Sequence, residues 1–139
     1  KIGRRKTIIG GVVMLSGGFL AAFIYSLFFD QFSYLLFVLF AIVGVAWAAI
    51  NVNSLPMVLE MCKGSEIGKF TGLYYTFSMS AQIVTPIVAG ALIEHVSMKS
   101  LFLYSAIASG IAIITMLQVK HGDNKIVAKK GLEAFDVED

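Results

Sequence analysis

The feature that most constrains this 139-residue sequence is a set of four long runs without a charged residue. They occupy residues 7–29, 31–59, 70–93 and 100–119. Each reaches the roughly 20 residues that a helix needs to cross a bilayer. None alternates as barrel strands do, and an open sheet in hydrocarbon would leave backbone groups unpaired. We therefore predict an all-α membrane protein with four transmembrane helices, at residues 7–29, 33–59, 70–93 and 100–119.

Composition supports the lipid bilayer as the main partner of this chain. The sequence is 58% hydrophobic and 14% charged, whereas ordinary soluble domains contain about 25% charged residues. The first run is too long for a signal peptide, and three further spans follow it. The single cysteine, Cys62, excludes an intrachain disulfide.

Lysine and arginine residues predict the orientation. Ten of the eleven lie in residues 1–6, 60–69 and 120–139, and only Lys99 lies in the two other connections. By the positive-inside rule, the basic loop 1–6, the loop 60–69 and the tail 120–139 are expected in the cytoplasm. We expect a multi-pass protein of the cell membrane. The net charge of +2 is explained by this topology, and we expect no nucleic-acid partner.

The second run contains two asparagines and a proline in an apolar setting. At helical spacing, Trp47, Asn51 and Ser54 share a face that Asn53 does not. Asn51 and Trp47 are candidates for binding a polar solute, with Asn53 as a packing contact, but both asparagines could instead bond neighbouring helices. Pro56 frees the carbonyl of Val52 and is a candidate hinge for a gate, although kinks also occur in static helices.

The third run carries a polar stripe. Its members recur at spacings of four and three residues and are Thr71, Tyr75, Ser78, Gln82 and Thr85. Lipid would penalise this face, so we expect it to lie against protein or a wet cavity, with Tyr75 and Gln82 as candidate solute ligands. Pro86 frees the carbonyl of Gln82 and is a second candidate gating residue. Small residues of the first and last runs, among them Gly17, Gly18 and Gly110, are expected to pack helices closely.

Several kinds of chemistry lack support in the sequence. No Asp, Glu, Lys, Arg or His lies deep in any run, so a coupling carboxylate would have to lie elsewhere. The two histidines, His95 and His121, stand far apart, and no phosphate-binding loop is present. We therefore expect no enzyme activity, no cofactor and no metal site.

The segment Lys1 to Lys6, with Gly3-Arg4-Arg5, resembles the second half of the cytoplasmic signature of the major facilitator superfamily. Residues 44–58 and 68–86 look like the tenth and eleventh helices of facilitators close to the sucrose transporters and the glycoside-pentoside-hexuronide permeases. The resemblance covers about residues 1–119. It implies a twelve-helix transporter of which this chain forms helices nine to twelve, with the N-terminal helices preceding it. It also implies that Gly3, Arg4 and Arg5 hold an inner gate.

These observations favour the C-terminal part of a secondary transporter. We expect it to move a small polar solute, in particular a sugar, by alternating access, with a proton or sodium ion as the coupling cation. The alternative is a complete four-helix protein that acts as an oligomeric scaffold or assembly factor, in which the polar stripe of the third run would be an oligomer seam.

Overall fold

The computed structural model describes residues 3–29, 31, 33–62 and 64–119. Four long helices account for nearly all of them: α1 (Arg4–Phe28), α2 (Tyr34–Leu59), α3 (Ile67–His95) and α4 (Ser100–Gln118). A short 3₁₀ helix, η1 (Gly64–Glu66), precedes α3. The described ranges contain no strand. All four helices are long and apolar enough to cross a membrane, which confirms the predicted fold class.

Three helix starts differ from the predicted ones, that of α2 by a single residue. Helix α1 begins at Arg4, so part of the segment predicted as a basic loop is helical. Arginine and lysine are good helix formers, and the extended backbone of Gly3 marks the point where the helix begins. Helix α3 begins at Ile67, directly after η1. The predicted tail, residues 120–139, lies outside the described residues.

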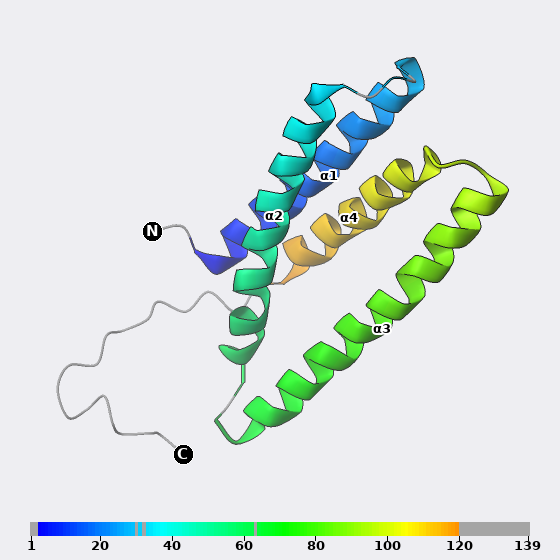
Figure 1. Cartoon of the computed structure of the whole chain (residues 1–139). Helices are drawn as coiled ribbons and strands as arrows, with labels where there is room; N and C mark the ends of the chain where they lie inside the picture. The colour runs from blue at the N-terminus through cyan, green and yellow to red at the C-terminus, as the bar shows by residue number, and fades with distance from the viewer. Residues whose placement is uncertain (1–2, 30, 32, 63, 120–139) are drawn as a thin grey trace.

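Helix α1 lies between α2 and α4 and forms the packed part of the structure (Figure 1). Its Ile8 and Val12 are buried against Met57 of α2, and Met116 of α4 packs on the same cluster. The hydroxyl of Ser16 donates to the carbonyl of Ala106 at 3.2 Å, which joins α1 to α4. The core is therefore a seam along α1.

Two glycines of α1 allow α2 to approach closely. A Cβ on Gly18 would lie 2.6 Å from Cγ2 of Val43. A Cβ on Gly11 would lie 2.9 Å from Cγ1 of Ile50 and 3.0 Å from the carbonyl oxygen of Ala46. Gly17 and Gly110, which were also predicted to pack, have open space where a Cβ would stand. Close approach in this structure thus depends on one face of α1.

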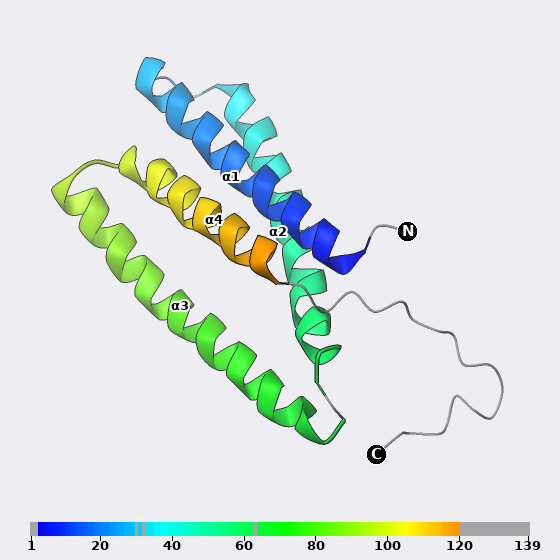
Figure 2. The same cartoon turned by 180° about the vertical axis from the view of Figure 1, so that it is seen from behind.

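Helix α3 stands apart from the other three helices. Both views show it diverging from α2 beyond the loop that joins them and meeting α4 only near its far end (Figure 2). None of its residues is buried. Its polar stripe is therefore left uncovered by the other described helices.

Candidate functional site

The candidate solute-binding residues of α2 lie on an uncovered face. Trp47 is 60% exposed, and Asn51, one turn further along, is also exposed. The Asn51 amide donates to the carbonyl of Trp47 at 3.0 Å. This bond uses one of two N–H groups, so the second N–H and the side-chain oxygen can serve another partner. Such a donor and acceptor pair matches the hydroxyls of a polar solute.

The corresponding residues of α3 are equally uncovered. Tyr75 is 46% exposed, and Gln82, two turns further along, is exposed. The Gln82 amide donates to the hydroxyl of Ser78 at 3.4 Å, so two members of the predicted stripe contact each other. The structure thus places the candidate ligands on two diverging helices.

A hydrogen bond between two side chains joins α2 and α3 near the end that is predicted to face the cytoplasm. The hydroxyl oxygens of Ser54 and Tyr74 lie 2.7 Å apart. Sequence reasoning placed Ser54 on the face of Asn51 but missed Tyr74 as its partner. The signal that could have identified Tyr74 was its position next to Tyr75, a member of the polar stripe in an otherwise apolar run.

The other α2 and α3 candidates have local contacts. Asn53 is half-buried and donates to the carbonyl of Ala49 in its own helix at 2.8 Å. This bond uses one N–H of the amide, as in Asn51, and the packing role of Asn53 against a neighbouring helix remains a prediction. Pro56 and Pro86 both lie inside helices that continue past them. Their gating role remains a prediction.

The basic residues at the start of α1 contact the ends of two other helices. Arg4 forms a salt bridge with Glu60, the C-cap residue of α2. Arg5 donates from Nη2 to the carbonyl of Leu117, near the end of α4, at 3.0 Å. Gly3 supplies the carbonyl that accepts the first backbone bond of α1, from Thr7 at 3.0 Å. The two arginines thus tie the start of α1 to the ends of α2 and α4, whereas the bond of Gly3 lies within α1.

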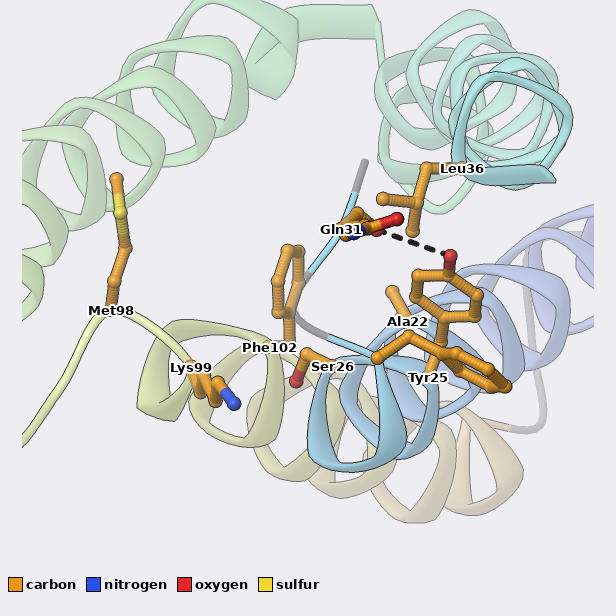
Figure 3. Close-up of a pocket in the computed structure, with 9 residues that line it drawn as sticks. Ala22, Tyr25, Ser26, Gln31, Leu36, Met98, Lys99 and Phe102 are labelled. Atoms are coloured by element: carbon orange, nitrogen blue, oxygen red, sulfur yellow. Dashed lines mark hydrogen bonds between the residues drawn. The ribbon is translucent and has the colours of Figure 1, made fainter. Parts of the chain in front are cut away.

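A pocket of about 320 Å³ lies at the opposite end of the bundle, between α1, the start of α2 and the start of α4 (Figure 3). Its lining is mostly apolar and aromatic, including Phe102 and a stacked pair formed by Tyr25 and Phe29. The Tyr25 hydroxyl donates to the carbonyl of Gln31 at 3.2 Å. The pocket contains none of the four predicted solute-binding residues, and sequence reasoning did not predict it.

Among the described residues, no group of three or more His, Cys, Asp or Glu side chains is placed to hold a metal ion. Outside the membrane spans, partial desolvation of the thiol and, second, the negative charge of Glu66 raise the pKa of Cys62. The described chain therefore offers hydrogen-bonding side chains on apolar helices and a basic cluster at one end.

Four helices of this length and hydropathy define a multi-pass integral membrane protein. A family model described as Major Facilitator Superfamily matches residues 1–137. The chain belongs to this family, whose members are transporters. Comparison with curated proteins and with solved structures found no match. Membership of a transporter family does not favour the alternative of a scaffold or assembly factor.

Proposed function

We propose that this chain forms helices nine to twelve of a secondary transporter for a small polyhydroxy solute such as a sugar. In this proposal, the exposed faces of α2 and α3 border the solute pathway. Asn51 and Gln82 bind solute hydroxyls, while Trp47 and Tyr75 shape the binding surface. The N-terminal helices of the same transporter cover the remaining sides of the pathway.

The observation that carries the proposal is the uncovered position of the two carboxamides. Asn51 and Gln82 lie within apolar helices on faces that α1 and α4 leave open. Lipid would leave part of their hydrogen-bonding capacity unused, so a wet cavity is the more favourable environment. Each amide also has an aromatic residue on the same helix, as binding sites for small polar molecules commonly do.

The finer features of the proposal follow from the resemblance and from charge. Alternating access is proposed from the superfamily, and coupling to a proton or sodium ion from the sucrose transporter and glycoside-pentoside-hexuronide permease branch. The described spans contain no Asp, Glu, Lys, Arg or His midway, so the coupling carboxylate is assigned to the preceding helices. Both termini are proposed to lie in the cytoplasm of a cell whose plasma membrane holds the protein.

The test is uptake of radiolabelled sucrose and xylose by cells or proteoliposomes that contain the full-length transporter. Asn51→Ala and Gln82→Ala should each raise the KM of the accumulated sugar by about threefold to tenfold, the scale of one lost hydrogen bond. Asn53→Ala is the matched control, because Asn53 also donates to the carbonyl four residues back but lies on another face.

The control variant should keep the wild-type KM. If neither sugar is accumulated by the wild type, the assignment to sugars is wrong. If Asn51→Ala and Gln82→Ala lose detergent stability but retain the wild-type KM, both amides bind neighbouring helices and do not line the pathway.

A further inference from the structure

We infer that the hydroxyl pair of Ser54 and Tyr74 is a latch that fixes α3 against α2 and so positions the two solute-binding faces relative to each other. Both residues act as positioning residues. The inference rests on the proposed function only for its effect on solute affinity. The mechanical part, the orientation of α3, stands on the contacts within the described chain.

The geometry of the latch is that of a strong hydrogen bond. The two oxygens lie 2.7 Å apart, the usual distance for two hydroxyl groups. Both side chains are half-buried, so water competes less for the bond than it would at an open surface. Ser54 lies five residues before the end of α2 and Tyr74 seven residues after the start of α3.

Helix α3 has little packing against the other described helices that could fix its orientation. It contains no buried residue, so a packed apolar seam like that of α1 does not set its angle or rotation. Beyond the loop that joins the two helices, α3 diverges from α2 and approaches the start of α4 (Figures 1 and 2). The other end of α3 is joined to α4 by a bond from the Ser100 hydroxyl to the carbonyl of Leu92 at 3.5 Å. The Ser54–Tyr74 bond thus limits how far α3 can turn away from α2 at the end where the two helices meet.

The latch also contacts the predicted binding residues on both sides. The Ser54 hydroxyl lies 3.3 Å from the carbonyl oxygen of Asn51. The Tyr74 ring packs edge-on against the ring of Tyr75, with centroids 5.4 Å apart. Loss of the bond would therefore free Tyr74 to rotate and would shift Tyr75 relative to Asn51.

The experiment measures the orientation of α3 without any solute. Spin labels are placed on Val45→Cys of α2 and Ile87→Cys of α3, two exposed positions beyond the latch, in full-length transporter whose other cysteines are replaced. The latch variants are Tyr74→Phe, which removes only the hydroxyl, and Ser54→Ala. Both should broaden the distance distribution between the labels.

Sucrose or xylose uptake supplies the second readout. Each latch variant should raise the KM by about threefold to tenfold with a smaller change in maximal rate, the range expected for one interhelical hydrogen bond. The double variant should raise it no further, because either change alone already breaks the bond. Tyr104→Phe, a hydroxyl removal on α4, is the matched control and should change neither readout.

An unchanged distance distribution in both latch variants would overturn the inference, and so would a broadened distribution with a wild-type KM. The proposed function has a separate test: it is wrong if Asn51→Ala and Gln82→Ala keep the wild-type KM. The label distances involve no solute, so they decide on the latch even in that case.

Discussion

The guanidinium of Arg4, in the first turn of α1, forms a salt bridge with Glu60, the residue that ends α2. The two residues are far apart in sequence, and the pair closes the end of the α1–α2 seam that is predicted to face the cytoplasm. Arg4 is 31% exposed and Glu60 22% exposed, so water screens the pair partly. Its contribution to the free energy of unfolding is expected to be about 1 kcal/mol or less.

We predict that this pair matters more for transport than for stability. Glu60→Gln should lower the maximal uptake rate several-fold while the melting temperature in detergent changes little. The combined Arg4→Glu and Glu60→Arg exchange should restore part of the rate, because opposite charges meet again. Arg4→Lys separates charge from geometry, since lysine lacks the planar fork of arginine. If Glu60→Gln and Arg4→Lys both keep the wild-type uptake rate, the salt bridge has no role in transport. The positive charge of Arg4 would then serve only to orient the protein in the membrane.

Arg5 is predicted to stabilise the end of α4. The last carbonyls of a helix have no partner within it, and Arg5 donates to that of Leu117. Arg5→Gln should therefore lower the free energy of unfolding by about 1 kcal/mol. Lys6→Gln, an exposed residue of the same turn, is the control and should leave the melting temperature unchanged. Equal stability of both variants would contradict the role of the bond.

Four glycines of α1 give a matched test of helix packing. Gly11→Ala and Gly18→Ala should lower the free energy of unfolding by about 1–3 kcal/mol, because the added Cβ would meet α2. Gly10→Ala and Gly17→Ala have open space and should be neutral or stabilising by up to about 1 kcal/mol. Thermal denaturation in detergent measures all four. Destabilisation of similar size at all four positions would show that α1 packs on a different face.

The thiol of Cys62 is predicted to react slowly at neutral pH. Its raised pKa lowers the fraction of reactive thiolate at pH 7, and labelling should speed up about tenfold per pH unit until the pKa is reached. Glu66→Gln removes a nearby negative charge, lowers the pKa and should accelerate labelling at pH 7.5. The measurement is the rate of maleimide labelling in inside-out vesicles. Identical rates in wild type and Glu66→Gln would contradict the electrostatic effect.

The same thiol tests the predicted orientation. A membrane-impermeant reagent should label Cys62 in inside-out vesicles but not in intact cells. Introduction of a cysteine at Ser97, in the opposite connection, supplies the control, which should react from outside the cell. Labelling of Cys62 in intact cells would invert the topology.

The sequence by itself determined the four helices. In lipid, a charge-free apolar run of sufficient length has no better backbone conformation, so length and hydropathy alone predict α1 to α4. Helical spacing also assigns Trp47 and Asn51 to one face of α2, and Tyr75 and Gln82 to one face of α3, because that spacing is a local property. The role of these faces in binding solute remains a prediction.

Only the tertiary structure decided which of these residues meet. Gly17 and Gly18 are neighbours in sequence but differ in the space around them. The rotation of α1 against α2 places Gly18 next to Val43, whereas Gly17 faces open space. The pairing of Arg4 with Glu60 and that of Ser54 with Tyr74 likewise depend on the crossing angles and the axial register of the helices. Those quantities arise from contacts between residues distant in sequence, and a periodic pattern within one helix carries no information about them.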